Sequence, residues 1–213
     1  MIEVVVEVGT KRVFASAVEW PGWCRAARTE EGALEALDAY LPRYAAVLSR
    51  AGLPGPTAAS SFDVLERLAG TATTDFGAPG VEACAEREPI TASAARRRAG
   101  LVAACWPYLG AVAAGAPATL RKGPRGGGRD RDAIVVHVED AEQAYARRIG
   151  IRHREMLATP DATRAAIAAR LGEASDGSAL VERGWTARYA ARRIAWHVLD
   201  HAFEIEDRST PAT

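Results

Sequence analysis

The hydrophobic pattern of the chain changes period partway along, and this change constrains the fold more than any other feature. Apolar and β-branched residues first form short runs of the kind found in strands, two of which flank a turn at 9–11. From Thr29 to Gly52 they recur at the spacing of a helix face. The order predicts an α+β fold whose first part is a small ββ(β)αβ domain over 1–70. Its strands are expected at 2–8, 12–18, 24–27 and 62–68.

The second part of the chain has a helical pattern almost throughout. Four stretches with helical spacing lie within about 120 residues, which is typical of an up-down four-helix bundle over 91–213. Pro107 is expected to kink or interrupt the first helix. Residues 71–90 lack a sustained period and are expected to form a linker or a crossing loop. The helices are expected at 91–114, 130–150, 161–172 and 186–207.

The charge balance and the apolar runs narrow the classes of function. The chain has 27 Lys and Arg against 27 Asp and Glu, so its formal net charge is zero, and a nucleic-acid partner held by bulk charge is not expected. No apolar run approaches the ~20 residues of a membrane span, and the N-terminus lacks the pattern of a signal peptide. We therefore expect a cytoplasmic protein with no membrane partner.

The three cysteines point to the same compartment. Cys24, Cys84 and Cys105 are odd in number and have no Cys-x-x-Cys spacing, which argues against a disulfide framework and against a zinc ribbon. Buried free thiols in a reducing cytosol are expected.

Three of the four histidines fall on two of the predicted helices. His197 and His201 are four residues apart, so their rings project from one helix face about one turn apart. Alone, such a pair is equally well explained as a polar surface pair. His137 lies among apolar residues, where a neutral ring needs a partner, either a hydrogen bond in the core or a metal ion. Together the three predict a divalent-metal site between facing helices, whereas His153 is expected on the surface.

The chemistry of such a site follows from its ligands. Three neutral imidazoles do not offset the charge of a divalent ion, and they leave at least one coordination position open. A thiol or a water bound at that position has a lowered pKa and loses its proton more readily. Asp200 and Glu204 are candidates to hydrogen-bond the ligand rings, solvated carboxylates being the alternative. Val198 follows His197, so the pair is not the metalloprotease motif, in which a Glu follows the first histidine.

Basic residues near this site have two interpretations. The Arg- and Gly-rich stretch 121–132 precedes the helix of His137, and Arg125 and Arg129 are candidates to contact an anionic group of a substrate. A solvated loop is the alternative. Arg192 and Arg193 likewise either neutralise a substrate or pair with acidic side chains.

The first part resembles the HicB-like domain. The resemblance rests on the turn at 18–23 (VEWPGW) followed by a helix start at 29–37 (TEEGALEAL), and covers about 1–70. HicB proteins are antitoxins that pair with a small RNase toxin, often with a DNA-binding appendage. Because no helix-turn-helix follows here and acidic and basic residues are balanced, the resemblance implies a structural or dimerisation module.

The second part resembles the DinB-like superfamily over about 90–208. The motif is His137, Glu142 and Tyr145 in the second helix, followed by His197 and His201 within 192–208. The resemblance implies a four-helix bundle that binds zinc, nickel or another divalent metal through three histidines. It further implies a homodimer and a metal-dependent transferase or isomerase that acts on a small molecule with a low-molecular-weight thiol as cosubstrate. A metal-dependent hydrolase is the other enzymatic possibility. The alternative is a regulatory or antitoxin-like protein in which the bundle is a scaffold.

Overall fold

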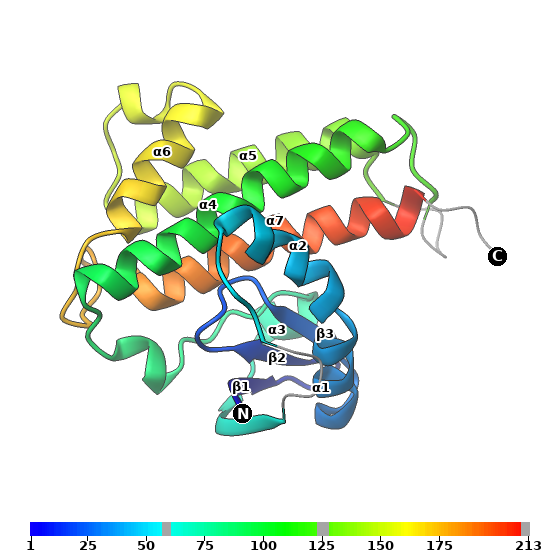
Figure 1. The fold of residues 1–213 in the computed structure, drawn as a ribbon, viewed down its shortest axis with the longest axis horizontal. Helices are drawn as coiled ribbons and strands as arrows, with labels where there is room; N and C mark the ends of the chain where they lie inside the picture. The colour runs from blue at the N-terminus through cyan, green and yellow to red at the C-terminus, as the bar shows by residue number, and fades with distance from the viewer. Residues whose placement is uncertain (57–60, 123–127, 210–213) are drawn as a thin grey trace.

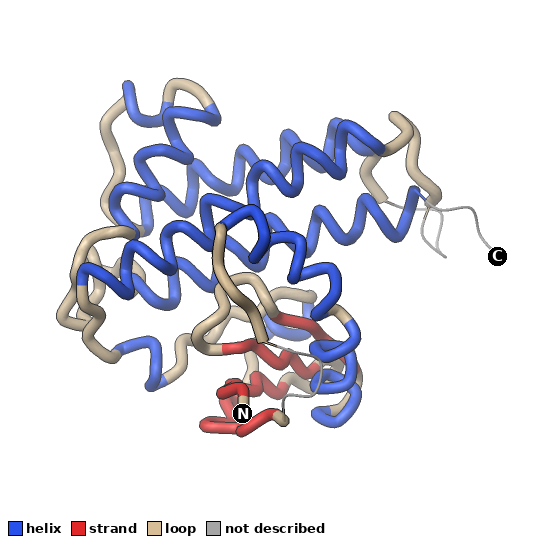
Figure 2. The backbone as a smooth tube through the Cα atoms, in the orientation of Figure 1, coloured by secondary structure: helices blue, strands red, loops and turns tan. Residues whose placement is uncertain are grey.

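A four-stranded sheet and a layer of helices make up the structure (Figures 1 and 2). The computed structural model describes residues 1–56, 61–122 and 128–209. The strands are β1 (Ile2–Val8), β2 (Val13–Ala17), β3 (Cys24–Ala27) and β4 (Phe62–Ala69), in the order β3-β2-β1-β4. β4 runs parallel to β1, and the other pairs are antiparallel. The predicted α+β class is therefore confirmed.

The expected helix from 29 to 52 is wrong, because the structure has two helices there. They are α1 (Glu30–Ala39) and α2 (Leu41–Ala51). Thr29 caps α1 by accepting the N–H of Gly32 at 3.1 Å. Pro42 lies in the first turn of α2, where its missing N–H is tolerated, whereas inside one long helix it would have left a carbonyl without its donor. Gly52 ends α2 with φ 66°.

Four further helices form the second part of the chain. They are α4 (Ala92–Gly115), α5 (Arg131–Arg148), α6 (Pro160–Leu171) and α7 (Ala187–Ser209). α4 packs along α7, α5 packs on α7, and α6 contacts both α4 and α5. Figure 1 shows α4 and α7 running in the same direction, with α5 antiparallel to both. Pro107 does not interrupt α4, because it lies on the exposed side of the helix, where water can reach the carbonyl that loses its donor.

One hydrophobic core runs through the sheet and the helices. It joins β1, α1 and α2 to α4 and α7 through buried side chains such as Val4, Leu37, Leu101 and Leu199. The turn before β3 approaches α7 closely at Gly22, whose φ is 91° and where a Cβ would lie 2.7 Å from a methyl carbon of Leu199. Only a glycine fits this position, so the turn fixes the distance between the sheet and α7.

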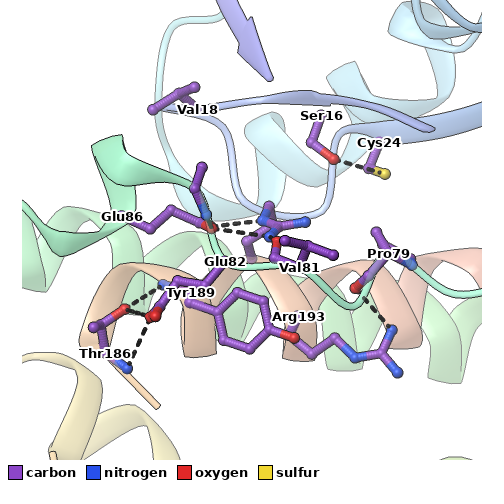
Figure 3. Close-up of polar contacts among 12 residues, drawn as sticks. Ser16, Val18, Cys24, Pro79, Val81, Glu82, Glu86, Thr186, Tyr189 and Arg193 are labelled. Atoms are coloured by element: carbon purple, nitrogen blue, oxygen red, sulfur yellow. Dashed lines mark hydrogen bonds and ion pairs between the residues drawn. The ribbon is translucent and has the colours of Figure 1, made fainter. Parts of the chain in front are cut away.

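Residues 70–91 cross from the sheet to the bundle with structure of their own. They contain α3 (Ala72–Phe76) and the 3₁₀ turn η1 (Cys84–Arg87). The buried carboxylate of Glu7 accepts the N–H groups of Gly80 and Val81, both at 3.0 Å. Figure 3 shows Glu82, Glu86 and Pro79 of this segment along α7, with Glu82 bonded to Thr186. The segment therefore ties the sheet to the helix that carries two of the histidines.

Within the described ranges, no helix combines the length and the apolar character needed to cross a membrane.

Candidate metal centre

His137 of α5 and His197 and His201 of α7 come together between the two helices. One ring nitrogen from each histidine lies within 4.8 Å of those of the other two. The ring centroids are 5.2 Å apart for His137 and His197, 4.9 Å for His137 and His201, and 4.6 Å for His197 and His201. The helical spacing of four places both α7 rings on one face, and the packing of α5 against α7 brings His137 opposite to them.

The three rings differ in their access to solvent. His197 is 6% exposed, whereas His137 and His201 are partly exposed. The cluster therefore lies at the border of the core, with one ring anchored inside and two at its outer side. A small molecule can approach such a cluster from solvent, which a closed structural site would not allow.

The surroundings favour the neutral form of His137 and His197. Burial lowers the pKa of His197 to about 2, with smaller contributions from the neighbouring rings. Burial also lowers the pKa of His137, helped by the charge of His201. A neutral imidazole has a free lone pair, so neither ring has to release a proton before it can bind an ion near neutral pH.

Glu204 holds the third ring. Its Oε2 lies 2.9 Å from His201 Nδ1, and its Oε1 accepts Arg208 Nη1 at 2.5 Å. These bonds lower the pKa of Glu204, the bond to His201 being the main cause. With Nδ1 engaged, His201 Nε2 is left to bind an ion. Arg208 in turn donates to the carbonyl of Arg121 at 2.8 Å, so the chain of contacts reaches the loop that precedes α5.

Asp200, the other candidate for this role, has a different partner. Its carboxylate pairs with Arg25 of β3 at 3.2 Å, which connects α7 to the edge of the sheet. Burial raises the pKa of Asp200, and the charge of Arg25 opposes this shift. Glu204 is therefore the carboxylate that orients a ring of the cluster.

One polar atom of the cluster is buried without a partner. No described residue forms a hydrogen bond with His197 Nδ1, although this nitrogen is inaccessible to solvent. Leaving such a group unsatisfied is costly, so this ring has a polar atom whose partner is not among the described residues. The orphaned nitrogen, the neutral rings of His137 and His197 and the oriented ring of His201 together fit a divalent metal ion.

Aromatic rings and one arginine lie beside His197. Tyr145 stands edge-on to His197 with ring centroids 5.5 Å apart, and Arg193 lies 4.7 Å from the ring centroid of Trp196 and 5.7 Å from that of Tyr145. Arg193 donates to the Pro79 carbonyl at 3.4 Å (Figure 3) and has no acidic partner among the described residues. Its charge is one of the smaller contributions to the low pKa of His197.

Other residues singled out in the sequence have different positions. Arg129 is exposed, and its charge contributes to the low pKa values of His137 and His197. Arg125 lies outside the described residues. Arg192 does not face the cluster, because it is buried against Glu86 at 2.6 and 2.9 Å.

Glu142 and His153 also lie apart from the cluster. Glu142 is buried and accepts Trp106 Nε1 at 2.7 Å and Arg164 Nε at 2.9 Å. His153 is exposed beyond the end of α5. Arg208, by contrast, was not among the sequence candidates, although its spacing of four from Glu204 and seven from His201 places all three on one face of α7.

The cysteines differ from the expectation in one respect. All three are free, but Cys84 is exposed, whereas Cys24 and Cys105 are buried. Cys84 lies at the start of η1 on the outer side of β4, where Glu66 accepts both its N–H and its thiol.

Comparisons of the chain with protein-family models, with curated proteins and with solved structures find no match. A function for the chain therefore has to be inferred from the site itself.

Proposed function

We propose that the protein binds one divalent metal ion through His137, His197 and His201 and uses it to catalyse a reaction of a small molecule. The observation that carries the proposal is the convergence of three ring nitrogens within 4.8 Å of one another. Imidazole ligands suit zinc and nickel, and a set of three histidines without a carboxylate leaves the charge of the ion uncompensated.

The cosubstrate we propose is a low-molecular-weight thiol. When bound, a divalent ion with an open position lowers the pKa of a thiol or a water so that it becomes a nucleophile near neutral pH. The resemblance of His137, Tyr145 and 192–208 to the DinB-like superfamily favours the thiol and a transfer or isomerisation reaction. The free cysteines are in keeping with a cytoplasmic protein.

The residues around the cluster have separate roles in this proposal. Glu204 fixes the orientation of the His201 ring, and Tyr145 covers the buried side of His197. Arg193, which has no acidic partner among the described residues and lies over the rings of Tyr145 and Trp196, would neutralise an anionic group of the substrate. Arg129 is placed to do so from the exposed N-terminal end of α5.

Metal analysis of protein purified without an affinity tag tests the site. We expect about one equivalent of zinc or nickel per chain, lost in His137→Ala and in His197→Ala. His153→Ala is the matched control, because this histidine is exposed and outside the cluster, and it should retain the metal. Stoichiometric metal that survives both substitutions in the cluster would contradict the site.

A spectroscopic experiment tests the thiol. In protein loaded with Co²⁺, addition of N-acetylcysteine should produce a sulfur-to-cobalt absorption band that saturates with thiol concentration. The band should be absent in His137→Ala and present in His153→Ala. A spectrum of the loaded protein that does not respond to the thiol would contradict thiol activation while leaving the metal site intact.

A further inference from the structure

A concave region lies at the end of the sheet, on residues that the metal cluster does not use. It is a hollow of about 1180 Å³ between the β1–β2 turn, the end of β3 and α3. The polar and aromatic side chains that line it are those of Thr10, Lys11, Arg12, Arg28, Asp75 and Phe76. Small-molecule sites in proteins are concave, with volumes of roughly 300–1,000 Å³, so the hollow has room for a ligand of nucleotide size.

The turn that forms one wall is held in place by hydrogen bonds. Asp75 of α3 accepts the hydroxyl of Thr10 and, at 2.7 Å, the N–H of Lys11. The N–H of Gly9 donates to the carbonyl of Arg12 at 2.8 Å. A Cβ at Gly9 would lie 2.4 Å from Asp75 Oδ1, so the turn and α3 are in close contact. The wall is therefore ordered before any ligand arrives.

Positive charge is in excess around the hollow. Lys11, Arg12 and Arg28 are exposed, and the one acidic side chain of the lining, Asp75, is already engaged by the turn. Neither Lys11 nor Arg28 forms an ion pair with a residue in the described part of the chain. A guanidinium binds phosphate oxygens through two parallel N–H groups, and an ammonium adds a point charge, so this combination suits a phosphate group.

Phe76 adds an aromatic face to the lining. Its side chain is 91% exposed, in contrast to Phe14 and Phe203, which are both 3% exposed. The ring lies at the end of α3, beside Gly77, where a Cβ would lie 3.7 Å from the guanidinium carbon of Arg12. An exposed aromatic ring next to cations offers a stacking surface for a planar base while the cations hold the phosphates.

We propose that this hollow binds a nucleoside phosphate, with Lys11, Arg12 and Arg28 on the phosphate oxygens and the base stacked on Phe76. Concavity favours a small ligand over a macromolecular surface, because the cations and the ring face a common space. The site does not depend on the metal centre, because it uses none of its residues.

Isothermal titration calorimetry of the full chain with ADP tests the site. We expect saturable binding tighter than about 1 mM, weakened about tenfold or more in Lys11→Ser/Arg28→Ser. Phe76→Ser should weaken the binding of ADP but leave the affinity for pyrophosphate unchanged, since pyrophosphate has no base to stack. All these residues are exposed, so the variants should keep the circular dichroism of the unsubstituted chain.

Two control variants distinguish binding in the hollow from attraction by bulk charge and from binding at the metal centre. Arg152→Ser/Arg154→Ser removes the same charge from two other exposed residues and should leave ADP binding unchanged. His137→Ala should also bind ADP normally, even if the proposed metal site fails. Equal losses in the Arg152/Arg154 control would show attraction by bulk charge and overturn the proposal. Binding of an acidic peptide without binding of ADP would also overturn it.

Discussion

Glu204 Oε2 lies 2.9 Å from His201 Nδ1, one helical turn further along α7, and no other carboxylate in the described chain is bonded to a ring of the cluster. We expect Glu204→Gln to lower the affinity for zinc by about 10- to 100-fold, because the ring loses the charged partner that orients it. Competition with a chromophoric zinc chelator measures this affinity.

Asp200→Asn provides the comparison for this prediction. The substitution removes a carboxylate of the same helix that pairs with Arg25 and is not bonded to a histidine. Its zinc affinity should stay close to that of the unsubstituted chain. If zinc affinity falls more in Asp200→Asn than in Glu204→Gln, then Asp200 orients the ring and the prediction for Glu204 is wrong.

The buried pair of Arg192 and Glu86 should contribute strongly to stability. Both side chains are at most 6% exposed, and the guanidinium also donates to the carbonyl of Val81 at 2.8 Å. Arg192→Met leaves the Glu86 carboxylate buried without its cation, so we expect the free energy of unfolding in urea to fall by about 3–5 kcal/mol. Arg192→Met/Glu86→Leu should recover much of this loss, and Arg183→Met, at a 91% exposed side chain, should change little.

The same pair shows where sequence reasoning reaches its limit. Arg192 and Arg193 are adjacent and chemically identical, so the sequence offers both as substrate contacts. On a helix they point about 100° apart, and only the folded chain shows that Arg192 faces Glu86, 106 residues away. Arg193 instead lies over the rings of Tyr145 and Trp196. Tertiary partners at such separations have no local signal.

Features set by local periodicity were predictable. The strand pattern and the helical spacing gave the α+β order, and the i, i+4 spacing placed His197 and His201 on one face. The sequence did not predict that the helix is divided into α1 and α2 at Tyr40. The apolar stripe continues across this residue, so the periodicity alone does not show the break before Pro42. The continuity of α4 through Pro107 depends on which side of the helix is exposed, a property of packing.

Gly22 should be intolerant of a side chain. Gly22→Ala would strain a backbone with φ 91° and place a Cβ 2.7 Å from Leu199 and 3.1 Å from Ala195 of α7. We expect a loss of about 1–3 kcal/mol in the free energy of unfolding. Because Leu199 lies between His197 and His201 in α7, zinc affinity should fall as well. Gly110→Ala, where a Cβ meets nothing within 4 Å inside α4, should instead raise stability by about 0.5–1 kcal/mol.

The reactivity of Cys84 should be controlled by Glu66. The thiol donates to Glu66 Oε1 at 3.3 Å, and this bond, with the negative charge of the carboxylate, raises the thiol pKa above its ordinary value of 9.0. A raised pKa means less thiolate at pH 8, and thiolate is the species that iodoacetamide attacks. In Glu66→Gln the pKa should fall towards 9.0, so alkylation at pH 8 should become several-fold faster. The difference in alkylation rate between Glu66→Gln and the unsubstituted chain should shrink once the pH exceeds the pKa of Cys84 in both proteins.

Mass spectrometry of the alkylated protein tests this at each cysteine separately. Cys24, whose pKa burial raises to about 12, and the buried Cys105 should stay unmodified while the chain is folded. Glu88→Gln is the matched control, because it removes an exposed carboxylate of the same segment that is not bonded to the thiol. If Glu88→Gln accelerates the alkylation of Cys84 as much as Glu66→Gln does, the net charge of the segment sets the rate, and the hydrogen bond to Glu66 does not.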